Sequence, residues 1–501
     1  MALPYPPAVA GETASTEPAV RADLAVVGAG AAGLFAALTA AREGARVALV
    51  SRSPLADTAS YWAQGGIAAA LAADDSPELH FADTLTAGRE AGRPTAARVL
   101  CEESPARVRD LEALGVRFDS DRAGALALGL EGGHSRRRVV HAGGSSTGRR
   151  VTRELSALAA TEERIQVLEP LAAGALWCHE GRCVGVVAVG PGEGALPVLA
   201  RGVLLATGGA AALWSRTTNP PGAAGTGLSL ALAAGAALAD LEFTQFHPTA
   251  LVTGGRREGF LVTEAIRGEG ALLLDAYGER FVDELAPRDQ VALAVQARML
   301  EQGTDSVGLD VRSVDLARFP NVASALAEVG LDPREPLPVA PAAHYTMGGV
   351  TADLDGRSSL PGLFAVGESA CTGLHGANRL ASNSLAECFV FGRRAALAGL
   401  DEPAPADAPA GAPEAEPAAL PPRSTREALW RGAGLARDAE GLLELLNDPF
   451  PLARSVAAAC LAREESRGAH QRRDHPATDP GLEGRHAVVR EGVEPRFEHW
   501  E

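Results

Sequence analysis

The stretch "ADLAVVGAGAAGLFAALTAAREGARVALVS", Ala22–Ser51, decides the fold of this chain. Two short apolar runs, "DLAVVG" and "ARVALV", flank an alanine-rich segment, which predicts a strand, a helix and a second buried strand. The turn after the first strand carries Gly28, Gly30 and Gly33 in GxGxxG spacing. The first two glycines permit a tight turn and the close approach of a pyrophosphate, and the third permits close packing of helix on strand. The segment therefore predicts a dinucleotide site at the start of an α/β domain.

The end of the second strand leaves the identity of the dinucleotide open. NAD-binding units usually carry an acid there for a ribose hydroxyl, whereas this chain has Ser51 and Arg52. Arg52 is compatible with a 2′-phosphate, and FAD is equally compatible at this point. The glycine turn "ATGG", Ala206–Gly209, favours FAD, because such turns close the second pass of the sheet in flavoproteins with two dinucleotide folds. On its own, this turn also fits a plain strand end.

Further apolar strands lie far along the chain and predict one nucleotide-binding domain built from distant segments. They are "ARGVLLATGGAA", Ala200–Ala211, and "PGLFAVGES", Pro361–Ser369, and both carry glycine turns. We therefore predict an α/β fold with a Rossmann-like FAD-binding domain at 22–240 and 343–400. Between these segments the composition changes to charged turns and helical stretches, which predicts an inserted α+β capping domain at 241–342.

The ends of the chain and one internal segment have a different composition. Residues 1–21 contain prolines and acids and predict a disordered tail in place of a signal peptide. The segment "DEPAPADAPAGAPEAEPAALPP", 401–422, predicts an extended, mobile linker. Beyond it, helical periodicity predicts a small helical C-terminal domain over 423–501.

Bulk properties exclude several classes of partner. The chain has 501 residues and a formal net charge of −17, which argues against nucleic acid or an anionic membrane. No apolar run is long enough to span a bilayer, so we expect a soluble protein. The six cysteines show no CxxC spacing, although Cys178 and Cys183 lie close together in a hairpin-like stretch. We expect no disulfide framework, no metal site and a reduced, cytoplasmic setting.

Several longer motifs make the prediction specific. They combine small, polar and aromatic residues in a fixed order: "TASYWAQGGIAAAL" (58–71), "EGGHSRRRVVHAGGSSTG" (131–148), "LEFTQFHPTAL" (241–251), "TEAIRGEGALL" (263–273), "APRD" (286–289), "AAHYTMGGV" (342–350) and "GLHGANRLASNSLAEC" (373–388). With them, the chain resembles the flavoprotein family of succinate dehydrogenase and fumarate reductase, and within it the branch of the L-aspartate oxidases. The resemblance covers 22–400 and resumes at Glu464–Pro476.

The resemblance implies FAD bound without a covalent link. Relatives with covalent flavin carry a histidine shortly before the "QGG" glycines, and Ala59 holds that place here. Thr226 replaces the acid of the family's "GDG" motif, so a hydroxyl would take over that contact near the flavin ribose. The residues that the resemblance assigns to the cofactor are Gly28, Ala29, Gly30, Ala31, Ala32, Gly33, Arg52, Ala59, Ser60, Tyr61, Trp62, Ala63, Gln64, Gly65, Gly66, Thr226, Glu368, Ser384 and Leu385.

The stretch "HGANRLASNSL", His375–Leu385, stands at the mouth of a predicted helix, whose N-terminus attracts negative charge. By resemblance, its upstream half faces the substrate, with Arg379 gripping a carboxylate. A planar guanidinium suits that role because it binds carboxylates bidentately. The downstream half begins the helix whose positive end points at the flavin ring.

The remaining substrate site is also implied by the resemblance. Glu131 stands where the dicarboxylate enzymes lack a carboxylate, and a negative side chain there suits an α-ammonium group. Arg288 resembles the family's proton-transferring arginine; without the resemblance, an ion pair with Asp283 or Glu284 would be expected. The catalytic residues are thus predicted to be Arg288, Glu131 and Glu264, and the substrate-binding residues His247, Thr263, His344, Arg379 and Ser382.

The reaction implied is the flavin-dependent oxidation of L-aspartate to iminoaspartate, with reoxidation by O2, giving H2O2, or by fumarate. In the family the product feeds quinolinate synthase in NAD biosynthesis, which makes that enzyme the implied partner. Two alternatives remain. A soluble fumarate reductase or succinate dehydrogenase-type flavoprotein is disfavoured by Ala59 and Glu131, and a non-catalytic flavin-binding protein by the presence of Arg288 and Arg379.

Overall fold

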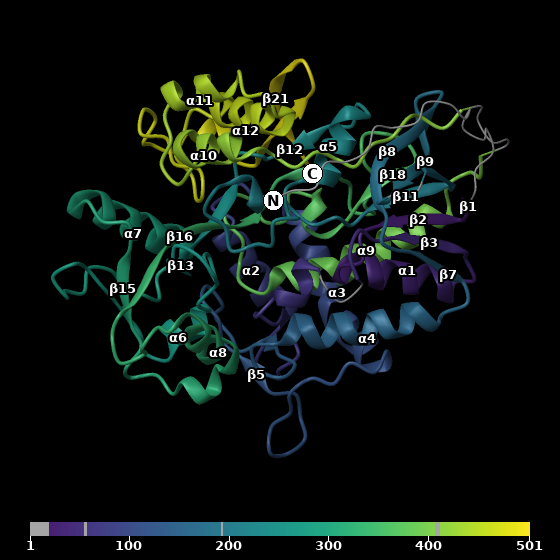
Figure 1. Cartoon of the computed structure of the whole chain (residues 1–501). Coiled ribbons are helices and arrows are strands. Elements are labelled where there is room, and N and C mark those ends of the chain that lie inside the picture. The colour runs from purple at the N-terminus through teal and green to yellow at the C-terminus, as the bar shows by residue number, and fades with distance from the viewer. Residues whose placement is uncertain (1–19, 55–57, 192–193, 406–410) are drawn as a thin grey trace.

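The computed structural model describes residues 20–54, 58–191, 194–405 and 411–501. A five-stranded parallel sheet lies on the right in Figure 1. Its strand order is β18-β11-β2-β3-β7, and every neighbouring pair is parallel. The strands are β2 (Leu24–Val27), β3 (Val47–Val50), β7 (Ile165–Leu168), β11 (Gly202–Leu205) and β18 (Leu363–Ala365). The strands expected from the apolar runs are thus present, and they share one sheet.

Alternate residues of these strands face two different cores. Leu24 and Val26 pack in one cluster with the helices, whereas Ala25 and Val27 pack in another with the antiparallel strands, as the side-chain period of a strand requires. The helices of the first face are α1 (Ala31–Arg42), α3 (Pro94–Ala113), α4 (Thr147–Thr161) and α9 (Asn383–Leu400), with α2 (Pro77–Ala87) beside α3. The second face is covered by the sheet β1 (Val20–Arg21), β10 (Leu196–Leu199), β9 (Arg182–Val189) and β8 (Ala172–His179).

A second layer lies beside the parallel sheet, on the left in Figure 1. Its antiparallel sheet has the order β13-β16-β15-β14 and its own hydrophobic core, centred on residues such as Val291, Leu309 and Val339. The strands are β13 (Thr244–Leu251), β14 (Leu272–Leu274), β15 (Val307–Asp310) and β16 (Leu337–Thr346), and the helices α6 (Glu264–Gly268), α7 (Arg288–Gln302) and α8 (Pro320–Val329). We propose that this layer is the capping domain of residues 241–342.

The C-terminal region is not purely helical. Helices α10 (Arg423–Gly432), α11 (Ala439–Leu445) and α12 (Pro451–Ala462) agree with the helical periodicity, but they are followed by a hairpin of β20 (Arg485–Arg490) and β21 (Val493–His499). Strand β20 pairs with β12 (Leu238–Ala239), and the sheet continues through β17 (Gly349–Thr351) and β19 (Ala370–Cys371). The prediction of a helical region over 423–501 is therefore incomplete, because "RHAVVR" is buried by pairing with a distant strand, which local periodicity cannot show.

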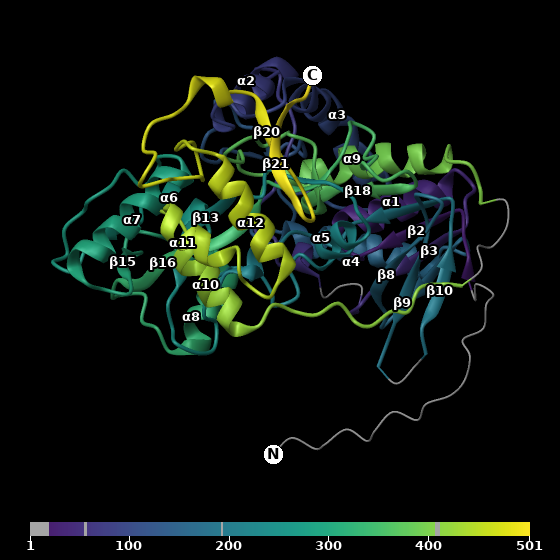
Figure 2. The same cartoon turned by 90° about the horizontal axis from the view of Figure 1, so that it is seen from above.

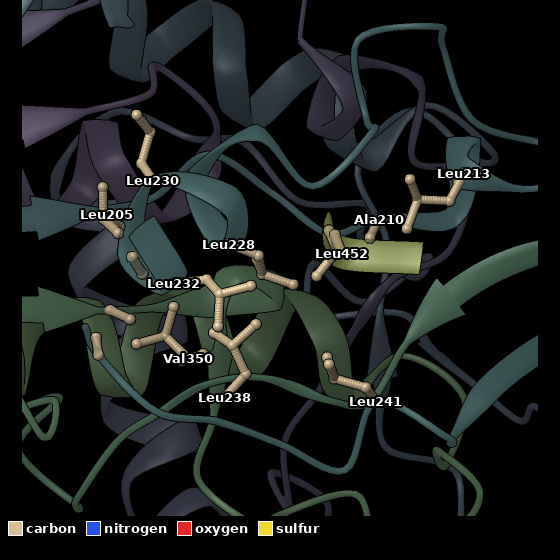
Figure 3. Packing of buried hydrophobic residues seen from close by; sticks show 14 of the residues in the cluster. Leu205, Ala210, Leu213, Leu228, Leu230, Leu232, Leu238, Leu241, Val350 and Leu452 are labelled. Carbon is tan, nitrogen blue, oxygen red and sulfur yellow. The ribbon is translucent and has the colours of Figure 1, made fainter. Parts of the chain in front are cut away.

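The C-terminal helices also share a core with the nucleotide-binding layer. Figure 3 shows Leu452 of α12 pointing into the cluster that contains Leu228 of α5 (Thr226–Ala233) and Leu213. A Cβ at Gly225, which caps α5 with φ +71°, would already press on the Leu452 side chain. Burial of a leucine side chain in this way stabilises the fold by about 1.5–3 kcal/mol. The C-terminal helices and the nucleotide-binding layer therefore form one packed unit. Figure 2 shows α12 beside α5 from above.

Two predicted non-helical segments are only partly described. Residues 1–19 of the expected tail lie outside the described residues, while Val20 and Arg21 form β1 and pair with β10, so the tail is predicted two residues too long. In the expected linker, residues 406–410 also lie outside the described residues. The part from 411 to 422 carries no helix or strand, and Glu416 packs against Gly174 of β8. A small sheet of β4 (Ile67–Ala68), β6 (Val139–Val140) and β5 (Leu128–Gly129) completes the fold.

Among the described residues, no helix has the length and apolarity required to cross a membrane.

Candidate functional site

A cavity of about 730 Å³ opens at the carboxyl ends of the parallel strands. Residues that end β2, β3, β11 and β18 line it, which is where open α/β sheets bind their ligands. The second layer supplies the opposite wall, through residues from 257–265, Arg288 and His344. Every site residue predicted from the sequence lines this cavity except Gly33 and Tyr61. The cavity thus joins segments that lie far apart in the chain, from Val27 to Ala418.

Gly28 and Gly33 perform the steric roles expected of them. Gly28 has φ +110°, and a Cβ there would collide with the Ala206 carbonyl of the neighbouring strand. A Cβ at Gly33 would collide with the Gly28 carbonyl, so Gly33 lies behind the turn and acts by packing, away from the cavity. The first turn of the twelve-residue helix α1 faces the cavity through Ala31 and Ala32. A helix N-terminus that follows a glycine turn can bind a pyrophosphate, because backbone N–H groups are accessible there.

We predict that Gly33→Ala loses the cofactor. The added methyl group must displace the Gly28 backbone, and with it the turn that forms the cradle. Purified Gly33→Ala protein should contain less than about a tenth of the flavin of the wild type and unfold at a lower temperature. Gly255→Ala is the matched control, since a Cβ at Gly255 meets no atom within 4 Å. Flavin content equal to that of the control would show that Gly33 does not support the site.

A second helix N-terminus enters the cavity from the other side. Ser382 caps α9 with φ +60°, and Ser384 and Leu385 in its first turn line the cavity. The Ser382 hydroxyl donates to Glu131 Oε2 at 2.6 Å and accepts from the Gly66 N–H at 3.1 Å. The motifs "QGG", "EGG" and "LASNSL" therefore meet at one hydroxyl group, and the positive end of an eighteen-residue helix stands beside them.

Arg379 is a buried cation without a carboxylate partner. Its side chain is 5% exposed, and among the residues that the structure describes no carboxylate lies within ion-pair distance. Nη1 donates to Ser384 Oγ at 3.0 Å and Nη2 to Gln245 Oε1 at 3.1 Å, while Nε finds no acceptor in the described part of the chain. Burial, followed by the like charge of Arg288, lowers the pKa of Arg379 to about 10. Such a group is costly to bury unless an anion completes it.

Arg288 and Glu264 form a close ion pair across the same cavity. Arg288 Nε donates to Glu264 Oε2 at 2.6 Å, and Arg288 Nη1 donates to Gln245 Oε1 at 3.2 Å. Burial disfavours the charged form of Glu264, but Arg288 and Arg267 outweigh it and hold the pKa of the carboxyl below its ordinary value. Arg288 therefore pairs with Glu264, and the ion pair with Asp283 or Glu284 that would be expected without the resemblance does not form.

The two histidines stand together with one ring nitrogen of His247 unsatisfied. The rings of His247 and His344 are 5.3 Å apart. The Thr249 N–H donates to His247 Nδ1 at 3.3 Å, which leaves the proton of a neutral ring on Nε2, and Nε2 has no partner among the described residues. Burial, with Arg288 nearby, keeps the pKa of both rings well below the ordinary value. His247 is thus a neutral ring whose Nε2–H has no acceptor among the described residues.

Three other residues predicted to bind the cofactor, Arg52, Thr226 and Glu368, also line the cavity. Arg52 is exposed and donates to the Gly222 carbonyl at 3.3 Å, and Thr226 begins α5. Glu368, after β18, accepts from the Thr346 N–H at 2.9 Å, and burial raises its pKa to about 7. Tyr61 lies off the cavity against Trp62 and Arg149.

Sequence reasoning missed two residues that organise the substrate end. Gln245 uses one oxygen to accept from both Arg288 and Arg379, and its amide donates to the Arg379 carbonyl at 3.0 Å. The Tyr345 ring lies under the Arg379 guanidinium at 4.3 Å, a cation–π contact. Both residues stand inside quoted motifs, "TQFHPT" and "HYTMGG", so the signal that could have found them is their place beside the two histidines.

The C-terminal motif, Glu464–Pro476, packs against the loop that carries Arg379. The Ala469 N–H donates to the Ala377 carbonyl at 2.8 Å, and a Cβ at Gly468 would collide with the same carbonyl. Nearby, buried Arg463 pairs with Glu242 at 2.6 Å and with Glu465 at 3.0 Å. The motif Glu464–Pro476 therefore supports the loop that carries Arg379.

The comparisons with known proteins define the class. A profile of the FAD binding domain family matches residues 23–385, and a profile of the fumarate reductase flavoprotein C-terminal region matches 437–498. A chain of E. coli quinol fumarate reductase superposes with a TM-score of 0.84 at 30% identity, covering 96% of each chain. Fold and cavity are those of a flavoprotein of the fumarate reductase type, and FAD is its cofactor.

The similarity to curated relatives is more specific. An L-aspartate oxidase of Caulobacter vibrioides is 46% identical and covers 94% of this chain and 96% of its own length. An L-aspartate oxidase of Streptomyces coelicolor is 43% identical and covers 94% of this chain and 92% of its own length. The chain belongs to the L-aspartate oxidase family.

Proposed function

We propose that this protein oxidises L-aspartate to iminoaspartate with FAD as the electron acceptor. One observation carries the proposal. A buried cation without a carboxylate partner among the described residues and a separate carboxylate line the same cavity, and both lie at the N-terminus of the same helix. Arg379 supplies the cation and Glu131 the carboxylate, and both contact the first turn of α9 or its cap. Their two charges complement an anion that also carries an ammonium group.

The substrate carboxylates would be held by the groups that now lack partners. Arg379 offers Nε together with its fork, and His247 offers Nε2–H. His344 is fixed through Nδ1 by Thr218 Oγ1 at 2.8 Å and lines the same cavity. We assign one carboxylate to Arg379 and the other to the histidines and Thr263.

The ammonium group would be read by Glu131. Its carboxylate is fixed by Ser382 at 2.6 Å and lies 3.7 Å from His141 Nε2. Succinate and fumarate have no positive group to offset this charge, so Glu131 favours an amino dicarboxylic acid over them. This residue therefore sets the substrate class.

Arg288 and Glu264 would move the proton. A guanidinium in water is a poor proton acceptor, but in a desolvated site a carboxylate at 2.6 Å can share the charge change. Gln245 holds Arg288 Nη1 towards Arg379, so the pair stands beside the proposed carboxylate site. We assign Arg288 to proton transfer, with Glu264 as its partner.

FAD, when bound, supplies the acceptor for the hydride that leaves the carbon bearing nitrogen. The glycine cradle at α1, the first turn of α9 and Glu368 would hold it. Ala59 has no group that could bond to the flavin, so we propose that the cofactor is non-covalent and is released by acid. The second layer would exclude water from the reacting atoms.

The proposal also includes the electron acceptor, the enzyme that uses the product and the cellular location. Reduced flavin would be reoxidised by O2, giving H2O2, or by fumarate, and the product would pass to quinolinate synthase as the first step towards NAD. Six free cysteines agree with a cytoplasmic location. A soluble fumarate reductase or succinate dehydrogenase-type flavoprotein is the alternative, and Glu131 and Ala59 disfavour it.

Glu131→Gln separates the two functions. The substitution keeps the shape of the side chain but removes the charge that would meet an ammonium group. We expect kcat/KM for L-aspartate to fall by about 10–100-fold, the value of a hydrogen bond to a charged group. Fumarate reduction by the same protein, measured with a reduced dye, should change by less than about threefold, because fumarate makes no such bond. Equal losses in both reactions would show that Glu131 does not read the amino group.

A further inference from the structure

The hairpin of β8 and β9 places two cysteines opposite each other. Cys178 pairs with Cys183 in the strand register, and His179 pairs with Arg182 at the end of the hairpin. The two turn residues, Glu180 and Gly181, have φ +49° and +74°, as a tight two-residue hairpin turn requires. The turn therefore fixes the register of the last two pairs, up to the irregularity between Trp177 and Cys178, and it places the two cysteines opposite each other.

The cysteine pair is of the type in which side chains come closest. The Cys183 N–H donates to the Pro361 carbonyl at 2.8 Å, outside the hairpin, so Cys178 and Cys183 do not exchange backbone hydrogen bonds. In such non-hydrogen-bonded pairs the Cα atoms are about 4.5 Å apart, within the range of about 4.4–6.8 Å that a disulfide spans. The register thus gives the pair the backbone spacing that a disulfide requires.

The two thiols differ in access and in ionisation. Cys178 is exposed on β8, the edge strand of its sheet, and Cys183 is fully buried. The neighbouring Cys183 thiol lowers the pKa of Cys178 to about 7, while the same pairing and burial raise the pKa of Cys183 well above its ordinary value. The Cys183 thiol itself donates to the Gly185 carbonyl at 3.5 Å. By contrast, burial raises the pKa of Cys101 to about 12. Cys178 therefore combines the exposure and the thiolate character of a reactive cysteine, with a second thiol beside it.

We propose that Cys178 and Cys183 are a redox site that a peroxide converts into an intramolecular disulfide. The Cys178 sulfur attacks one oxygen of hydrogen peroxide, which becomes a sulfenic acid on Cys178, and the other oxygen leaves as water. The Cys183 sulfur then attacks the Cys178 sulfur, and the hydroxyl group leaves with the Cys183 proton as a second water. Two thiols are oxidised by two electrons, and one peroxide is reduced to two waters.

This site goes beyond the proposed function but lies close to it. Strand β8 begins at Ala172 and Ala173, which line the cofactor cavity. The hairpin also contacts the segment after α9: Trp177 and Val184 pack with Ala412, and Arg182 pairs with Glu402 at 2.6 Å. A disulfide would pin the free end of a hairpin whose opposite end forms the cavity wall. Peroxide would arise at this cavity whenever O2 is the acceptor.

The test uses the flavin-loaded protein and added hydrogen peroxide, so its result is independent of whether L-aspartate is a substrate. After brief treatment and blocking of free thiols, the peptide with Cys178 and Cys183 should be lighter by two hydrogen atoms and should regain both thiols on reduction. Cys183→Ala should stop at a sulfenic acid on Cys178, trapped by a cyclic diketone, and should react about tenfold more slowly because its thiolate is less favoured. Cys101→Ser, on α3, is the control and should behave as the wild type.

Three results would overturn the proposal. They are unmodified Cys178 and Cys183 in treated wild type, oxidation of wild-type Cys178 to sulfinic acid without a disulfide, and a disulfide that links two chains. If Cys183→Ala loses its flavin, Cys178→Ser tests the same order of oxidation. In that variant Cys183 should remain a free thiol after peroxide treatment, and its oxidation would contradict the proposal.

Discussion

Arg288→Lys is expected to lower kcat for L-aspartate oxidation by about 10²–10⁴-fold, the usual contribution of a positioned proton-transfer group. Lysine retains the positive charge, but it cannot reproduce the planar fork that reaches Glu264 at 2.6 Å and Gln245 at 3.2 Å together. Flavin content should be unchanged, and KM should change by less than about threefold, because we assign the substrate carboxylate to Arg379. Steady-state rates with both electron acceptors provide the measurement.

The control for Arg288 lies on the same helix. Arg298 of α7 is partly exposed and pairs with Asp275 and Glu301 at 3.6 and 3.3 Å, away from the cavity. Arg298→Lys should keep wild-type turnover. A loss of kcat below about tenfold in Arg288→Lys would contradict a role in proton transfer, whatever its effect on KM.

Arg379→Met is expected to abolish the binding of dicarboxylates while leaving the protein at least as stable. Loss of a buried charge that meets a ligand carboxylate costs about 2–5 kcal/mol, so the Kd should rise by about 30–4000-fold. In the free protein, however, Arg379 is buried beside Arg288 without an anion, and an apolar side chain of similar length removes that cost. We therefore expect a melting temperature equal to or above that of the wild type.

Two measurements check the Arg379 prediction. The perturbation of the flavin absorption spectrum by a non-reacting dicarboxylate gives the Kd, and thermal unfolding at fixed flavin content gives stability. Arg379→Lys should lie between the wild type and Arg379→Met in affinity, because one ammonium cannot reach Ser384, Gln245 and a ligand at once. Arg334→Met, at an 86% exposed side chain, is the control for the loss of an arginine. Unchanged affinity together with lower stability would identify Arg379 as a structural residue.

Much of the nucleotide half could be predicted because its determinants are local. Gly28 and Gly33 are needed for a turn and a packing contact within one strand–helix unit, and both sit where the spacing places them. Four of the five strands were visible as apolar runs, since a strand buried on both faces carries few polar residues, whereas the fifth, β7, has an exposed Gln166 and was not predicted. The order of the strands was not visible, because β7, β11 and β18 pair with strands that are far away in the sequence.

The substrate end required resemblance, because its contacts are between distant motifs. Nothing local marks Arg379 as an arginine without an acid, or Gln245 as the acceptor shared by two guanidinium groups. The same limit explains the hairpin of β20 and β21, which is completed by pairing with β12. It also explains Pro417 and Ala418 in the proline-rich segment, which line the cavity although their composition predicts only an extended chain. The composition of a segment predicts its own local structure, whereas each of these contacts depends on a second segment far away in the sequence.

The most direct test of the account is an anaerobic titration of the purified protein with L-aspartate. The flavin should be released into solution by acid precipitation, as a non-covalent cofactor is, and L-aspartate should bleach the oxidised flavin band of the native protein without any other electron donor. Succinate at the same concentration should leave the band unchanged. A flavin that stays with the acid precipitate, or one that succinate bleaches and L-aspartate does not, would contradict the proposal that Glu131 and Arg379 select an amino dicarboxylic acid.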